Sequence, residues 1–174
     1  GVGYTIDKKY YLPPITFDAD ELEAIGLGIS MVRLWTDDRF AEKANSALEK
    51  IAAVLPTDLQ GELEQITTYA VPNRPKTPWT VNFSELREYI RDRKKISMVY
   101  QDEKQRETTR TIQPLALFFF NPVWLLTGWC EKRNDFRNFR IDRIQTLTAS
   151  DQCFKDDPDK NLKAYLTSVG VCHE

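Results

Sequence analysis

The hydrophobic spacing of this 174-residue chain changes from a helical to a strand period near Lys95, and this change restricts the fold more than any other feature. Before Lys95, apolar residues recur at steps of three and four, as on one face of a helix. After it, Ile96, Met98 and Tyr100 alternate with the residues between them, as in a half-buried strand. The sequence therefore predicts an α+β protein in which helices precede a small sheet.

Two amphipathic helices are predicted in the first third of the chain. Asp18 is suited to cap the first, and Glu21 lies three residues on, which completes the pattern of a capping box. The second runs from about Asp38 to Leu55 and ends before Pro56. Adjacent helices favour an antiparallel hairpin. Because two helices bury little surface alone, this hairpin must pack on the rest of the chain, on a partner chain, or on both.

A short helix capped by Asn82 and ending near Arg93 leads into five predicted strands. These strands cover residues 96–100, 108–114, 115–120, 123–130 and 136–144. Five short strands close together favour a curled sheet or barrel whose edges are mostly paired. Beyond them, Asp157-Pro158 and the apolar residues that follow predict a C-terminal helix with proline in its first turn.

Charge is distributed unevenly along the chain. The 24 Lys and Arg residues against 26 Asp and Glu residues give a net charge of -2, which excludes a bulk polycation for nucleic acid or membranes. Residues 1–70 hold 6 basic and 12 acidic residues, whereas residues 71–150 hold 15 and 9. The basic middle therefore leaves room for a local anion-binding patch.

Several functional classes lack their sequence signals. Cys130, Cys153 and Cys172 form no close pair and His173 stands alone, which argues against a disulfide framework or a metal site and fits a reducing cytoplasm. The apolar run from Leu115 to Phe120 is too short to cross a bilayer. The chain has no nucleophile elbow, P-loop or zinc-protease motif, so we expect no catalysis, no cofactor and no membrane partner.

A proline-rich stretch divides the chain. Residues 71–78 hold three prolines and are therefore expected to be extended rather than helical. Together with the charge pattern, this stretch predicts five segments. They are a connector over 1–17, a helical dimerisation or linking region over 18–70, a linker over 71–82, a sheet domain over 83–150 and a helical end over 151–174.

Four stretches of the second half together resemble a WYL domain. They read ISMVY at 96–100, RTIQP at 110–114, WLLTGWC at 124–130 and RNDFRNFRIDRI at 133–144. The last contains the FRxDRI signature of the family, and the naming triad reads Trp-Leu-Leu at 124–126. The resemblance implies an Sm-like, SH3-like barrel led by a short helix.

The N-terminal part is similar to the region that follows the winged helix-turn-helix domain in bacterial WYL-type transcriptional regulators. GVGYTI at 1–6 resembles the final strand of that domain, and LPPITF at 12–17 resembles its connector. The resemblance implies a cytoplasmic regulator without its DNA-reading domain, with operator DNA as the partner of the missing part. Because palindromic operators are read by two-fold dimers, we expect a homodimer involving residues 18–55.

Arginines and aromatic residues form the candidate ligand site. Guanidinium groups suit phosphate or carboxylate, and aromatic rings stack on bases. By position in the family-like motifs, the expected ligand-binding residues are Tyr100, Thr108, Arg110, Trp124, Arg133, Arg137, Arg140 and Arg143. Arg137 is the first choice because no acidic residue adjoins it, whereas Arg140 and Arg143 flank Asp142 and suit ion pairs. Alternation places Arg137 and Arg143 on one face.

Three interpretations of these residues remain open. The resemblance favours a sensor for a nucleotide or nucleic-acid fragment. A plain single-stranded nucleic-acid binder would use the same arginines and aromatic residues. The third interpretation is architectural, because strand arginines commonly form ion pairs and alternating aromatic residues commonly belong to a core.

Overall fold

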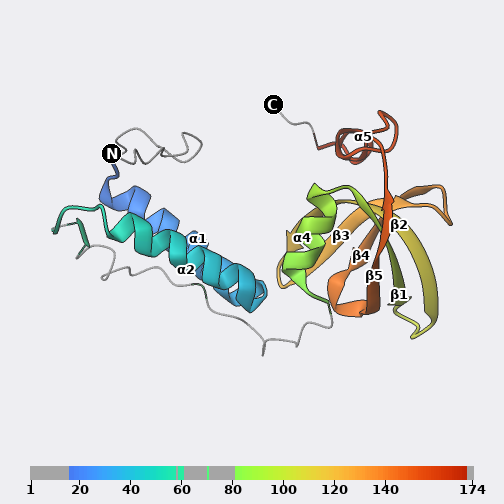
Figure 1. Cartoon of the computed structure of the whole chain (residues 1–174), viewed down its shortest axis with the longest axis horizontal. Helices are drawn as coiled ribbons and strands as arrows, with labels where there is room; N and C mark the ends of the chain where they lie inside the picture. Colours follow the sequence, from blue (N-terminus) through green and yellow to red (C-terminus); the bar gives the residue numbers. More distant parts are fainter. Residues whose placement is uncertain (1–15, 58, 61–69, 71–80, 172–174) are drawn as a thin grey trace, which may run out of the picture.

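The computed structural model describes residues 16–57, 59–60, 70 and 81–171. Figure 1 shows a helical hairpin whose one end lies beside a curled sheet with its own helices. The predicted N-terminal connector before residue 16, the linker before Val81, and the residues Cys172 and His173 lie outside the described residues.

The hairpin consists of α1 (Ala19–Trp35) and α2 (Asp38–Ala52), which run side by side. The capping box is confirmed, because Asp18 Oδ1 accepts a hydrogen bond from the Glu21 amide at 2.8 Å and Glu21 Oε2 accepts one from the Asp18 amide at 3.0 Å. Helix α2 ends at Ala52, three residues earlier than predicted. Its N-cap is Asp37, whose carboxylate accepts from the Phe40 amide at 2.9 Å.

The third described helix, α4 (Phe83–Arg91), leads into the sheet and is capped by Asn82 as predicted. The strands are β1 (Lys94–Gln101), β2 (Glu107–Phe120), β3 (Val123–Cys130), β4 (Asp135–Arg140) and β5 (Ile144–Cys153), all antiparallel to their neighbours. Their order is β4-β3-β2-β1-β5.

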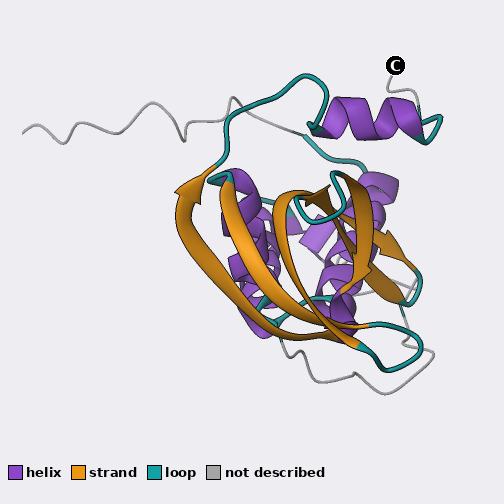
Figure 2. Ribbon diagram, turned by 90° about the vertical axis from the view of Figure 1, so that its right-hand side faces the viewer, coloured by secondary structure: helices purple, strands orange, loops and turns teal. Residues whose placement is uncertain are grey.

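The predicted closed barrel is wrong, because the described sheet is open. Its edge strands, β4 and β5, follow one another in the chain and are joined by the 3-10 turn η2 (Ile141–Arg143) instead of pairing. The sheet is strongly curved, as Figure 2 shows. Because η2 lies between β4 and β5 in the chain, it connects the two edge strands directly. The result is a curled α+β domain whose sheet is not closed into a barrel.

Three boundaries and one whole strand also differ from the sequence prediction. The expected strands 108–114 and 115–120 form the single strand β2, because a bulge between Pro114 and Ala116 accommodates the proline that lacks an N–H donor. The expected strand 136–144 ends at Arg140, and the fifth strand, β5, was missed. The last helix, α5 (Leu162–Ser168), begins after an Asn161 cap, and not at Pro158.

The core lies between the concave face of the sheet and α4. Alternate residues of the strands meet helix residues there and are almost completely buried: Ile96, Met98, Ile112, Leu126, Phe83 and Leu86. Helix α5 lies on the opposite face, where the Tyr165 ring contacts Phe118 and Phe136. No helix of the described residues is long and apolar enough to cross a membrane.

Candidate anion-binding site

Three of the predicted arginines line one cavity of the curled sheet. Arg110 of β2, Arg137 of β4 and Arg133 of the intervening β3–β4 turn line a cavity of about 460 Å³ together with Cys130 and Phe139. The strand register explains this convergence. Arg110 lies two residues from buried Ile112, and Arg137 two residues from buried Phe139, so both start on the concave face.

The β3–β4 turn sets the position of Arg133. The amides of Arg133 and Asn134 both donate to the Cys130 carbonyl, at 3.1 and 2.8 Å. Asn134 has a φ of 50°, a left-handed conformation that asparagine tolerates better than most residues. This tight turn holds Arg133 at the rim of the cavity, and Arg133 has no ion pair within the part of the chain that the structure describes.

Arg110 is the most informative member of the site. Its Nη1 atom is buried and has no hydrogen-bond partner in the described structure. A buried charged donor without an acceptor is costly, and such groups in native proteins call for an explanation. An anion seated between the three guanidinium groups would supply the missing acceptor.

Arg137 does have an acidic partner, contrary to the sequence argument. Its Nη2 atom lies 2.9 Å from Asp135 Oδ2, two residues earlier on the same face of β4. Both side chains remain about half exposed, at 51% and 53%. An ion pair in such a solvated position contributes little, so an incoming phosphate or carboxylate can compete for the guanidinium.

Arg140 and Arg143 do not belong to this cavity. Arg140 makes a two-pronged contact with Asp142, with Nε at 3.0 Å and Nη2 at 2.6 Å from the carboxylate oxygens. This contact lowers the pKa of the Asp142 carboxyl and raises the pKa of the Arg140 guanidinium. Arg143 pairs with Glu103 at 3.2 Å. Its predicted place beside Arg137 is wrong, because η2 ends the strand alternation at Arg140.

Tyr100 and Thr108 do not line the cavity. The Tyr100 ring packs edge-on against Phe139 with 5.1 Å between ring centroids, and its hydroxyl accepts from the Arg140 amide at 3.4 Å. Thr108 faces Tyr100 across the β1–β2 ladder and donates to the Tyr100 carbonyl at 3.3 Å. Tyr100 therefore supports Phe139, which lines the cavity.

Trp124 lies elsewhere. Its indole N–H donates to the Trp35 carbonyl of the hairpin, and its ring packs against Phe83 and Phe119. This contact joins residues 89 positions apart, so no local pattern could predict it. Cys130 and Phe139 also line the cavity and were not predicted from the sequence. The register between β3 and β4 brings them there. Trp35 itself packs against Phe119, with 5.5 Å between the ring centroids.

Comparison with known proteins identifies the sheet domain. Residues 81–149 match the family model described as WYL domain, so the predicted WYL domain is present. A similar solved structure is the proteasome accessory factor B/C (PafBC) of Arthrobacter aurescens, with 20% sequence identity and a TM-score of 0.42. The alignment covers 81% of this chain and 21% of that chain, so the present chain spans about a fifth of the length of that protein.

Proposed function

We propose that this chain is the ligand-sensing region of a cytoplasmic bacterial transcriptional regulator, and that its WYL domain binds a nucleotide-like or nucleic-acid-fragment effector. The observation that carries the proposal is the cavity in which three arginines converge while Arg110 Nη1 lacks an acceptor. Two or three guanidinium groups around one space match the charge and geometry of a phosphate. The presence of a WYL domain supports a regulatory role over a catalytic one.

In this proposal, DNA is read by a separate winged helix-turn-helix domain. A sensor acts by binding its effector better in one of two conformations, and so shifts the population that the DNA-reading domain experiences. The operator is thus a partner of the complete regulator. The described residues contribute the effector site and the hairpin.

The hairpin is the proposed homodimer contact. On helix α1, the Leu22 side chain is buried, whereas Met31 is 39% exposed. Among the described residues, apart from its chain neighbours and the backbone of its own helix, no atom lies within 4 Å of where a Gly28 Cβ would stand, so a second backbone can approach closely. A second copy packing on this face would bury apolar surface that one chain leaves in water.

The test is a fluorescence anisotropy titration with labelled cyclic and linear nucleotides and with short single-stranded oligonucleotides. We expect saturation by at least one of them. Arg137→Ala should weaken binding by about 2 kcal/mol, or about thirtyfold, the loss expected for one charge-assisted contact. Arg110→Gln should weaken it at least as much. Arg106→Ala is the matched control, because Arg106 is paired with Asp102 in the β1–β2 turn, outside the cavity.

The same titration separates the proposal from its alternative, a single-stranded nucleic-acid binder. The alternative draws support from the exposure of Arg133 and Arg137 at the rim, which a longer strand could follow. A binder gains affinity as the oligonucleotide lengthens, whereas a sensor cavity saturates with one or two nucleotides. Unchanged affinity in Arg137→Ala and Arg110→Gln, together with lowered melting temperatures, would mean that the arginine cluster is architectural.

A further inference from the structure

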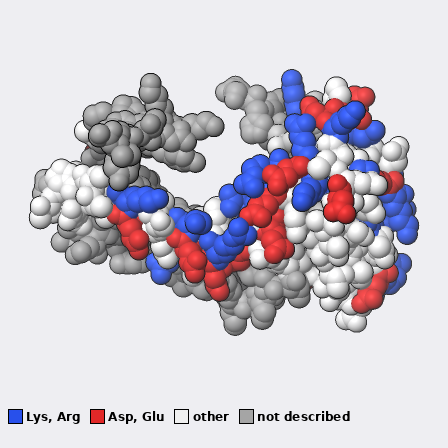
Figure 3. All heavy atoms as spheres, in the orientation of Figure 1, with Lys and Arg blue, Asp and Glu red and all other residues white. Residues whose placement is uncertain are grey.

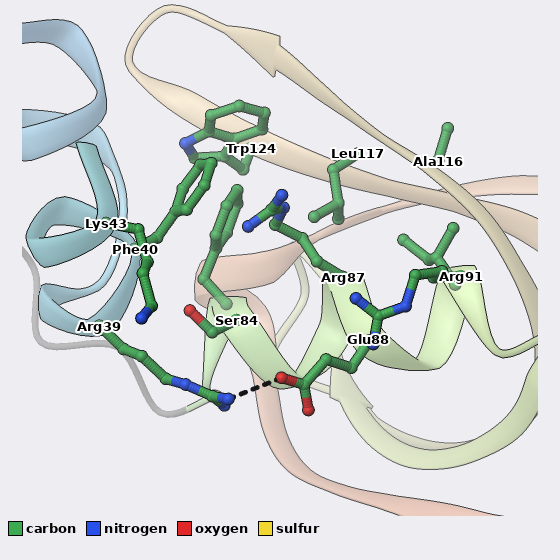
Figure 4. Close-up of a pocket in the computed structure, with 12 residues that line it drawn as sticks. Arg39, Phe40, Lys43, Ser84, Arg87, Glu88, Arg91, Ala116, Leu117 and Trp124 are labelled. Atoms are coloured by element: carbon green, nitrogen blue, oxygen red, sulfur yellow. Dashed lines mark hydrogen bonds and ion pairs between the residues drawn. The ribbon is translucent and has the colours of Figure 1, made fainter. Parts of the chain in front are cut away.

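A second and larger cavity lies where the hairpin meets the WYL domain. This junction cleft has a volume of about 510 Å³ and is formed by α2, α4, β2 and Trp124 of β3. Figure 4 shows its residues converging from these elements. Its apolar wall consists of Phe40, Phe83, Leu117 and Trp124, with 4.8 Å between the ring centroids of Phe83 and Trp124. It shares no lining residue with the cavity of Arg110, Arg133 and Arg137, the arginine cavity.

The rim of the junction cleft is strongly basic. Four cations line it, Arg39, Lys43, Arg87 and Arg91, against the single carboxylate of Glu88. Glu88 is engaged by Arg39 at 2.7 Å. Figure 3 shows Lys and Arg side chains interleaved with Asp and Glu side chains along the band that runs from the hairpin to α4. Arg91 is paired with Asp92 at 3.2 Å, so the positive charge of the cleft that is not paired rests on Arg87 and Lys43 within the described residues.

Arg87 is held in a conformation suited to an anion. Its guanidinium carbon lies 3.7 Å from the centroid of the Phe40 ring, so the guanidinium rests on an aromatic face. Stacking of this kind occupies the face of the group and leaves its N–H edge available for a planar acceptor. Within the described ranges, neither Arg87 nor Lys43 has a carboxylate partner.

We propose that the junction cleft binds a small organic anion with an aromatic body, of the aryl carboxylate class. The carboxylate would meet the Arg87 guanidinium edge and the Lys43 ammonium, and the ring would pack on Leu117 and Trp124. The volume is that of a small-molecule pocket.

The position of the site links ligand binding to the contact between the hairpin and the WYL domain. Phe40 and Lys43 belong to the hairpin, whereas Arg87 and Trp124 belong to the WYL domain. A ligand that contacts both parts binds only while they are docked. It therefore stabilises the docked arrangement by its binding free energy.

The experiment compares 2-naphthoate with its neutral analogue 2-naphthamide, by calorimetry and ligand-detected NMR on the whole chain. We expect 2-naphthoate to bind about tenfold more tightly than 2-naphthamide, because only the carboxylate can use the cations. Arg87→Gln and Lys43→Gln should each remove most of that difference. Both side chains are exposed, so both variants should keep the melting temperature of the unmodified chain.

Arg110→Gln serves as the control, because it alters the other cavity and should leave 2-naphthoate affinity unchanged. Absence of 2-naphthoate binding, equal affinity for the two probes, or unchanged affinity in both Arg87→Gln and Lys43→Gln would overturn the proposal. Loss of 2-naphthoate binding in Arg110→Gln would assign the probe to the arginine cavity and would also overturn it.

Discussion

The carboxylate of Asp37 fastens the hairpin to the WYL domain, and its removal gives the sharpest stability prediction. Asp37 caps α2, and it also accepts from the Ser84 amide at 2.7 Å and from the Ser84 hydroxyl at 2.8 Å, in the first turn of α4. That amide has no partner inside its own helix, and Ser84 is only 6% exposed. One side chain thus serves the first turns of two helices from different parts of the chain.

For Asp37→Ala, we expect a loss of about 3 kcal/mol in the free energy of unfolding. Loss of the α2 cap accounts for about 1 kcal/mol. Leaving the buried Ser84 amide without an acceptor accounts for about 2 kcal/mol more. For a chain of this size, the total corresponds to a fall in melting temperature of about 6 to 12 °C. Ser84→Ala removes only the hydroxyl donor and should cost about 1 kcal/mol.

Urea unfolding followed by circular dichroism would measure these losses, with Glu42→Ala on the exposed face of α2 as the control. The double variant with Asp37→Ala and Ser84→Ala isolates their interaction, which should be about 1 kcal/mol. A coupling near zero, or a loss below about 1 kcal/mol in Asp37→Ala, would refute the idea that this carboxylate joins the two parts.

Three further outcomes follow from individual contacts. Gly128→Ala should cost about 2 kcal/mol or more in urea unfolding, because a Cβ there would lie 2.6 Å from the backbone oxygen of Gln113; a smaller loss would mean that the β2–β3 ladder adjusts. The Arg140 hydrogen bond lowers the pKa of Asp142, so its stabilisation is present above the unfolded pKa and is lost as pH falls through the folded pKa. Unfolding free energies from about pH 6 to about pH 2 should therefore fall less in Asp142→Asn than in the unmodified chain, and parallel curves would contradict this. Light scattering should report about twice 20.2 kDa for the unmodified chain and about 20.2 kDa for Met31→Glu, and a dimer in both would place the contact away from α1.

Local signals in the sequence were sufficient for the order of the helices and for the caps of α1 and α4. A capping side chain lies within three residues of the amide that it accepts, so Asp18 and Asn82 could be recognised from short stretches. The change of period near Lys95 likewise reports a property of neighbouring residues. The order of the helices and the presence of a small sheet after them were therefore predictable.

The remaining features depend on residues far apart in the chain. Pro114 suggested a strand boundary, yet a bulge keeps β2 continuous through it. The site shows the same limit. Alternation placed Arg137 and Arg143 on one face, but it could not reveal that η2 redirects Arg143 towards Glu103 or that Trp124 contacts the hairpin. Pairing across the sheet, which no single stretch encodes, decides which cations meet.

The two basic cavities lie at opposite ends of one pair of strands, and their surroundings differ in a way that decides what each accepts. On β2, Arg110 lies at the arginine cavity and Leu117 at the junction cleft, about 23 Å of strand apart. On β3, Cys130 and Trp124 mark the same two ends. Positive charge is common to both cavities and cannot distinguish ligands. The apolar surface can, because several aromatic rings line the junction cleft, whereas Phe139 is the aromatic residue of the arginine cavity within the described structure. A compact phosphate therefore gains most where guanidinium groups converge, and an anion with a broad apolar body gains most where it removes ring surface from water.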